Sequence, residues 1–139
     1  MGPHHDTVVD EVALRLISAG VDGLLVRATL RYDPLDPLAV EATFQTGPEP
    51  VAWVLGRDVL SGGLHAPTGD GDVRVWPAAL SGGEVNRVMI ELRSAHGSAT
   101  LAVDAADLDS FLLRTFQAVP QGTEADRLDL DGVVARLLT

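Results

Sequence analysis

The sequence predicts an α+β domain in which antiparallel strands precede helices at the C-terminal end. Apolar and polar residues alternate with a period of two through the first half, whereas apolar residues recur at helical spacing in the last third. Clusters of glycine, proline and aspartate separate these segments, as expected of turns. The length of 139 residues fits one domain. We therefore expect antiparallel sheets of about seven strands, a short middle helix and two C-terminal helices.

The first half is expected to form four strands. In the second of them, Val26, Ala28 and Leu30 alternate with polar residues, a pattern typical of a strand with one buried face. The fourth strand is nearly all apolar, so we expect both of its faces to be covered. The four expected strands are 12–16, 26–32, 40–45 and 51–55, and the turn-rich linkers around them are 18–23, 33–37 and 46–50.

The middle of the chain changes period. A short helix is expected at 57–64, because two glycines close it. A turn rich in Gly and Asp at 67–72 is expected to lead into a strand at 73–76, which Pro77 ends. Two further strands are expected at 88–92 and 101–103.

The last third is expected to be helical. Asp104 and Asp107 suit a helix N-terminus, and Pro120 and Gly122 stop that helix. A last helix is expected after Asp129 or Asp131. The apolar stripes that predict the two helices are Leu108, Phe111, Leu112 and Phe116, then Leu130, Val133, Val134 and Leu137. We expect residues 1–139 to form one domain, with a flexible start at 1–9 and the C-terminal helices within 104–139.

The chain contains a faint internal repeat. The same series occurs twice: a strand, a dipeptide that ends in Asp, a helix and a Pro/Gly break. The dipeptide is Arg57-Asp58 in the first copy and Ala106-Asp107 in the second. An ancient duplication and a chance use of the same stop signals both explain this pattern.

The charge and composition exclude several kinds of chemistry. The net charge is −10, all ten basic residues are arginine, and the chain has no lysine and no cysteine. The missing cysteine excludes a disulfide scaffold, a thiol nucleophile and cysteine-ligated zinc, and the missing lysine excludes a P-loop. A domain this acidic repels nucleic-acid phosphates and anionic lipid. We find neither a secretory signal nor an apolar run long enough for a membrane span, and we expect a cytoplasmic protein.

Motifs that suggest catalysis or metal binding have simpler explanations. The loop Leu80–Glu84 resembles the signature loop of ABC-type ATPases, but a Gly-Gly turn explains it. Asp129-Leu130-Asp131-Gly132 resembles part of a calcium loop, but oxygen ligands are missing at both ends. The histidines lack ligand spacing, and no serine lies in a nucleophile elbow. We therefore expect no cofactor, no metal site and no enzymatic activity, and favour a non-enzymatic interaction domain.

A set of motifs runs from about residue 10 to the end of the chain. They are Leu30-Arg31-Tyr32-Asp33, Asp36-Pro37-x-Ala39-Val40, Ala42-Thr43-Phe44, Val51-x-Trp53-Val54, Arg57-Asp58-x-Leu60, Gly63-Leu64-His65, Pro67-Thr68-Gly69-x-Gly71-Asp72-Val73-Arg74-Val75-Trp76-Pro77, Phe111-Leu112-x-Arg114-Thr115 and Val119-Pro120-x-Gly122-Thr123-Glu124. Together these motifs resemble the SsgA-like proteins, regulators of sporulation-specific cell division in filamentous actinobacteria. The stretch from Gly63 to Pro77 is most similar to the SsgB branch.

The resemblance implies a protein that is not an enzyme. It implies recruitment of the tubulin-like GTPase FtsZ to septum sites, promotion of Z-ring assembly, and an SsgA-type positioning protein as a second partner. It also implies a Whirly-like fold with two halves of four strands and a helix each. Because Whirly proteins bind single-stranded nucleic acid, a nucleic-acid-binding module is the alternative function, and the charge of −10 without lysine argues against it. The resemblance places the protein at the cell septum, with no direct membrane insertion.

The motif residues are candidates for folding or for partner binding, and the sequence leaves both roles open. Arg57 and Arg74 could pair with Asp58 or Asp72, and the two tryptophans are read as core or interface anchors. Apolar strands with few helices to cover them predict a homo-oligomer that assembles through its sheets, with a trimer favoured by analogy. The candidate site residues are Trp53, Arg57, Asp58, Gly71, Asp72, Arg74, Trp76, Pro77, Phe111, Pro120 and Gly122.

Overall fold

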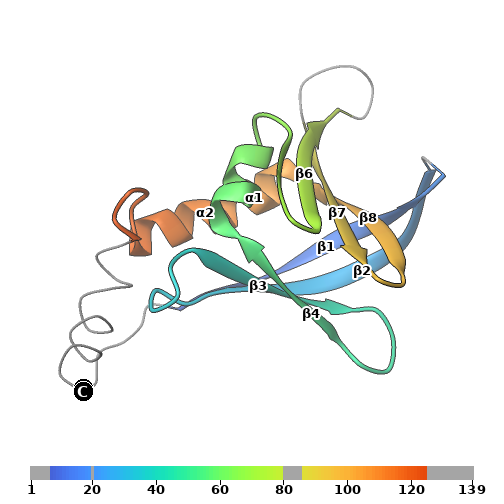
Figure 1. The fold of residues 1–139 in the computed structure, drawn as a ribbon, viewed down its shortest axis with the longest axis horizontal. Helices are drawn as coiled ribbons and strands as arrows, with labels where there is room; N and C mark the ends of the chain where they lie inside the picture. The colour runs from blue at the N-terminus through green and yellow to red at the C-terminus, as the bar shows by residue number, and fades with distance from the viewer. Residues whose placement is uncertain (1–6, 20, 80–85, 125–139) are drawn as a thin grey trace.

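The computed structural model describes residues 7–19, 21–79 and 86–124. These residues form one strongly bent antiparallel sheet of eight strands with two helices on one side of it (Figure 1). The elements are β1 (Val8–Ser18), β2 (Val21–Tyr32), β3 (Ala39–Gln45), β4 (Val51–Gly56), α1 (Arg57–Gly63), β5 (Thr68–Asp70), β6 (Val73–Ala78), β7 (Arg87–Ser94), β8 (Gly97–Asp104) and α2 (Ala105–Ala118).

The sheet joins two halves that contain the same series of secondary-structure elements. Its strand order is β4-β3-β2-β1-β8-β7-β6-β5, so each half consists of four strands followed by a helix, and β1 pairs with β8 at the centre. The expected α+β class and antiparallel pairing are confirmed. The count of seven strands is wrong by one among the described residues, because Thr68–Asp70 forms β5 inside the segment expected to be a turn. A hairpin through Gly71, at φ 59°, pairs it with Val73–Val75.

Several strands are longer than expected. β7 (Arg87–Ser94) and β8 (Gly97–Asp104) extend beyond the expected 88–92 and 101–103. β1 reaches Ser18 and β2 begins at Val21, so the linker expected at 18–23 shrinks to a tight turn in which Ala19 has φ 52°. β1 also begins at Val8, within the segment 1–9 that was expected to be flexible. β6 continues through Pro77 to Ala78. The helix expected after Asp129 or Asp131 lies outside the described residues.

The core lies between the inner face of the sheet and the two helices. Alternate residues of the strands point inward, as the period of two predicts, and Leu60, Leu108 and Phe111 of the helices meet them. The prediction that both faces of β4 are covered is wrong. Leu55 is buried, but Ala52 and Val54 on the outer face are exposed, Val54 to 67%.

The second helix begins and packs as its sequence predicts. The side chain of Asp104 accepts a hydrogen bond from the backbone N–H of Ala106 at 2.8 Å, which makes Asp104 the N-cap. Leu108, Phe111 and Leu112 are buried along one stripe, as the i, i+3, i+4 spacing requires. Neither described helix is long and apolar enough to cross a bilayer.

Candidate functional site

Arg57 is the most buried charged residue that the structure describes. It follows β4 directly as the first residue of α1, and its side chain is 0% exposed. Its backbone N–H donates to the carbonyl of Leu38 at 2.9 Å, which extends the β3–β4 ladder by one bond. The strand therefore delivers a guanidinium group directly into the interior, beneath the C-terminal end of α2.

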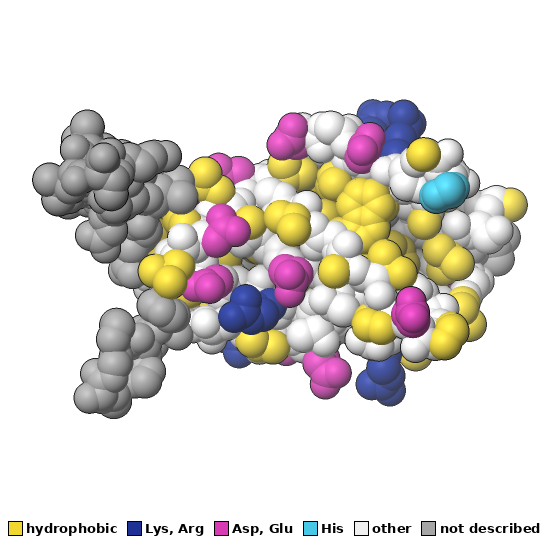
Figure 2. Space-filling view, turned by 60° about the horizontal axis from the view of Figure 1, so that its bottom comes forward, with side chains coloured by type: hydrophobic (Ala, Val, Ile, Leu, Met, Phe, Trp, Pro, Cys, Tyr) yellow, Lys and Arg dark blue, Asp and Glu magenta, His cyan; other side chains and the backbone are white. Residues whose placement is uncertain are grey.

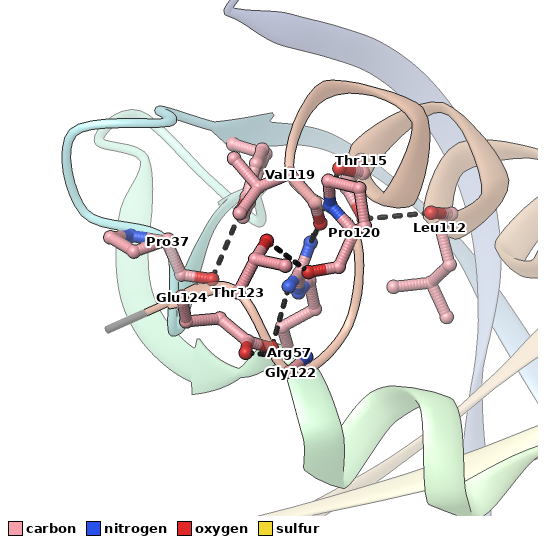
Figure 3. A network of polar contacts seen from close by, with 10 residues as sticks. Pro37, Arg57, Leu112, Thr115, Val119, Pro120, Gly122, Thr123 and Glu124 are labelled. Atoms are coloured by element: carbon pink, nitrogen blue, oxygen red, sulfur yellow. Dashed lines mark hydrogen bonds and ion pairs between the residues drawn. The ribbon is translucent and has the colours of Figure 1, made fainter. Parts of the chain in front are cut away.

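The guanidinium binds the end of that helix (Figure 3). Nη1 donates to the carbonyl oxygens of Thr115 at 3.2 Å and Val119 at 2.8 Å, and Nη2 donates to Oε2 of Glu124 at 2.7 Å. The last carbonyls of a helix lack partners within the helix and carry partial negative charge. Because the last turn of α2 contains no basic residue of its own, Arg57 supplies the positive charge from a distant part of the chain.

Glu124 completes the pair from the segment after α2. Its Oε1 accepts a hydrogen bond from the backbone N–H of Gly122 at 2.7 Å. The pKa of Glu124 lies below its ordinary value. The main cause is a hydrogen bond that the carboxylate accepts from the backbone N–H of Glu124 itself, and the next is the hydrogen bond from Arg57. Burial of the carboxylate acts in the opposite direction. The carboxylate is therefore ionised at neutral pH, and the pair is a charged one.

Aromatic rings close the cluster around the guanidinium. Its central carbon lies 4.2 Å from the ring centroid of Phe116 and 5.0 Å from that of Tyr32, both within cation–π range. The Tyr32 hydroxyl donates to the carbonyl of Pro37 at 3.0 Å. Nε of Arg57 is the one buried side-chain N or O atom among the described residues without a hydrogen-bond partner. Since arginine stays protonated, this cluster holds segments together rather than transferring protons.

The candidate residues thus divide between the interior and the surface. Arg57 and Phe111 are buried, and the expected pairing of Arg57 with Asp58 or Asp72 is wrong, because Glu124 is its partner. Pro120 accepts hydrogen bonds from Thr123, and Gly122 has φ 90°, so both shape the turn that presents Glu124. Sequence reasoning left Glu124 out of the candidate set although it lies in a quoted motif.

A first surface groove lies on the β5–β6 hairpin and contains part of the longest motif. It has a volume of about 450 Å³, and its lining includes Arg74, Trp76 and Glu91. Arg74 is exposed and lies opposite Glu91 of β7 in the register. Trp76 is half-buried and lies opposite Met89. Exposed charge next to an aromatic face is a combination suited to binding a protein.

The remaining motif residues shape this hairpin. Gly71 adopts a positive φ that only glycine accepts without strain, and the carbonyl of Asp72 accepts a hydrogen bond from the N–H of Arg93 at 2.9 Å. Pro77 lies beyond the three residues of β6 that pair with β5, where a strand tolerates the missing N–H. The hairpin alone therefore explains why Gly71, Asp72 and Pro77 occur in the motif, without a binding partner.

A second groove lies on the inner face of the sheet, at the end that the helices leave open. Its volume is about 440 Å³, and it is lined by Trp53 of β4 with mostly apolar residues of β1, β2, β3, β7 and β8. The polar residues of its lining are Thr46, Ser94, His96 and Ser98. Figure 2 shows hydrophobic side chains gathered to the right of centre, with most of the charged side chains to their left and along the upper and lower margins. Trp53 is half-buried and packs against the core, so it serves both the core and the surface. Among the described residues, no group of three or more His, Cys, Asp or Glu could hold a metal ion.

Comparison with known proteins defines the class. The family model described as "Streptomyces sporulation and cell division protein, SsgA" matches residues 26–124, and the chain belongs to this family of sporulation-specific cell division proteins. The match includes Arg57, the whole lining of the first groove, and the lining of the second groove apart from Leu16 and Leu24. The family is one of cell division proteins and not a known enzyme family.

Individual relatives cover nearly the whole chain. The SsgB protein of Streptomyces coelicolor is 51% identical over 133 residues, which is 95% of this chain and 96% of that protein. The SsgB protein of Frankia casuarinae is 45% identical over 135 residues, or 96% of this chain and 93% of that one. An SsgA-like sporulation-specific cell division protein from Thermobifida fusca, solved as a crystal structure, superposes with a TM-score of 0.85 at 38% identity, covering 99% of each chain. An SsgB structure solved in work on longitudinal cell division in Streptomyces coelicolor gives a TM-score of 0.82 at 52% identity, covering 91% of this chain and all of that one.

Proposed function

We propose that the protein is an adaptor that recruits FtsZ to septum sites and promotes Z-ring assembly during sporulation, together with an SsgA-type positioning protein. The observation that carries the proposal is the nearly full-length similarity to SsgB proteins, which are named as sporulation-specific cell division proteins. The protein acts by binding, in the cytoplasm and at the septum, as a homo-oligomer for which a trimer is favoured.

The groove on the β5–β6 hairpin is the surface that we assign to FtsZ. Both proteins are expected to be acidic, so net charge does not drive their association, and local arginine and aromatic contacts must do so instead. Arg74 and Trp76 supply such contacts, because the guanidinium is exposed and the indole is half-exposed beside it. Arg57 cannot contribute, since it is 0% exposed.

Sedimentation of FtsZ polymers tests the proposal. With GTP, the protein is expected in the pellet and the yield of FtsZ polymer is expected to rise, whereas with GDP both stay in the supernatant. Arg74→Glu should reduce co-sedimentation. Arg27→Glu, the same charge change at an exposed residue of β2 that lies outside the motifs and lines neither groove, is the matched control and should not reduce it. If the unmodified protein neither pellets with FtsZ nor changes the polymer yield, the proposed function is wrong.

A further inference from the structure

Within the part of the chain that the structure describes, the edge of the sheet next to the second groove lacks the usual protection against a further strand. β4 is the terminal strand, and among the described residues it pairs with β3 alone. Its residues Val51 to Leu55 contain no charge, no proline and no bulge, which are the devices that natural edge strands use. The opposite edge differs, because β5 is only three residues long and contains Gly69 and Asp70.

The register shows which backbone groups of β4 remain open. The N–H of Arg57 donates to Leu38, and bonded pairs alternate with non-bonded pairs along an antiparallel ladder. Continuing the alternation puts Val51, Trp53 and Leu55 in bonded pairs with β3. The N–H and C=O groups of Ala52 and Val54 therefore point away from the sheet, where they can pair with an added strand.

The open edge and the groove share side chains. Val51 and Trp53 belong to β4 and also line the groove, and Leu24 of β2, 66% exposed, lines it from further along the inner face. Alternate side chains of a strand added to β4 would point to this same face and extend the apolar lining. An edge that offers backbone bonds beside an apolar groove is the arrangement used for recognising extended peptides.

The charges around the groove define the chemistry of its occupant. No Asp, Glu or Arg lines it, on a chain with a net charge of −10. Exposed acids flank β4 at both ends, Glu49 before it and Asp58 after it, while the adjacent Arg57 is buried and paired. An occupant with an uncharged apolar core and basic flanks is complementary to this arrangement.

We propose that β4 and the groove bind an extended peptide segment of a protein partner by strand addition, with alternating apolar residues at its core and Lys or Arg on its flanks. The proposal goes beyond the proposed function, because it concerns a different surface and does not depend on FtsZ being the partner.

A library of random linear decapeptides displayed on phage, selected on the whole protein, provides the probe. The enriched peptides should alternate apolar residues between basic flanks, and one of them is then synthesised for titration. Leu24→Asp should weaken its binding at least tenfold by placing a charge in the groove. Leu113→Asp is the matched control, because Leu113 is 55% exposed on α2 and lines neither groove, and the affinity of this variant for the peptide should stay within twofold of the unmodified protein.

Two further measurements test the backbone contacts. Val54→Pro removes an N–H that points to the open edge and should weaken binding at least tenfold, whereas Val54→Thr should not; circular dichroism checks that both variants are folded. Methylating alternate peptide nitrogens should also abolish binding, and this result stands even if Val54→Pro does not fold. The proposal is overturned if no peptide is enriched, or if Leu24→Asp and N-methylation leave the affinity unchanged. It is also overturned if light scattering shows that Leu24→Asp turns an oligomer into a monomer, since a second copy then occupies the edge.

Discussion

Arg57 illustrates how a buried charge becomes part of a stable fold. Taking a guanidinium out of water costs several kcal/mol, so it is tolerated only with good geometry and partners for its hydrogens. Here two carbonyls and one carboxylate accept from the guanidinium nitrogens, and Phe116 and Tyr32 lie against its faces. The planar fork of arginine fits these partners, whereas an ammonium group could not meet them all.

Replacing this arginine by an apolar residue should be severely destabilising. Arg57→Met leaves the carbonyls of Thr115 and Val119 and the carboxylate of Glu124 without their donor, and breaking a buried pair in this way costs about 3–5 kcal/mol. Urea unfolding followed by circular dichroism measures the change. Arg74→Met is the control, and because Arg74 is exposed its effect should be within about 0.5 kcal/mol. Equal losses for both variants would mean that the buried cluster contributes little.

The pair also predicts how stability depends on pH. The pKa of Glu124 is lowered in the folded state from its ordinary value of 4.5, so its contribution is fully present above pH 4.5 and is lost as the pH falls through the folded pKa. Urea midpoints of the protein and of Glu124→Gln should therefore differ by a constant amount near neutral pH. The difference should shrink below pH 4.5. Midpoints that remain equally far apart down to pH 3 would contradict the assignment.

At the scale of elements, α1 joins the two halves because glycines let it come close. It contacts β4, β5 and β6, and Gly63 at its end is buried against β6. A Cβ atom added to Gly63 would lie 2.6 Å from Cβ of Val75, a backbone-near position that cannot move aside easily. The glycines that predicted the end of this helix therefore have a second role in packing.

Gly63→Ala should consequently overpack the helix against the sheet. Extra methyl groups in a packed core cost about 1–3 kcal/mol, and we expect a loss of that size in the free energy of unfolding. Gly47→Ala is the matched control, because a Cβ at position 47 would meet nothing within 4 Å. Thermal unfolding distinguishes the two variants, and a Gly63→Ala protein as stable as Gly47→Ala would contradict the packing argument.

The elements that sequence alone predicted are those with one buried face. β1, β2 and β3 alternate because their inner side chains enter the core, and the stripe of α2 does the same with helical spacing. β5 was missed because its three residues, Thr68-Gly69-Asp70, have no apolar alternation and are in a strand only through pairing with β6. The outer face of β4 was expected to be covered, since its apolar residues do not reveal which face is open.

The candidate site was predicted less completely than the fold. The motifs identified Arg57 and both tryptophans, but no local pattern indicates that Arg57 pairs with Glu124, 67 residues away. Local spacing suggested Asp58 or Asp72 instead. The second groove likewise depends on residues from six strands, and only Trp53 among them was a candidate. A single sequence does not show which residues distant along the chain come into contact, so neither the Arg57–Glu124 pair nor the second groove could be predicted from it.

At the scale of the whole molecule, the outer face of the sheet has exposed apolar residues at the two ends of the β1–β2 pair. Val9 is 49% exposed at one end and Leu25 is 45% exposed at the other, with charged residues such as Glu11 and Arg27 between them. We propose that these two ends are contacts between copies of the chain. The net charge of −10 opposes self-association, so the contact must bury enough apolar area to overcome repulsion.

Light scattering after size exclusion tests this assembly. We expect a species larger than the 14.6 kDa of one chain, with three copies favoured. Leu25→Asp should shift it toward the monomer, whereas Leu24→Asp on the inner face should not. Raising the salt concentration should favour the oligomer by screening the repulsion. A protein that is monomeric at every salt concentration would show that its sheets do not associate.

The central pairing of the sheet has a consequence for the order of folding. Within each half, every pairing joins strands that are consecutive in the chain, so each four-stranded meander can form from short-range contacts. The pairing of β1 with β8 is different, because it joins Leu14 to Val103 and Ile17 to Thr100 across most of the chain. Long loops are slow to close, so this step should limit the folding rate. The bond from Arg57 to Glu124 joins the same two halves across 67 residues, so we expect it to form late as well.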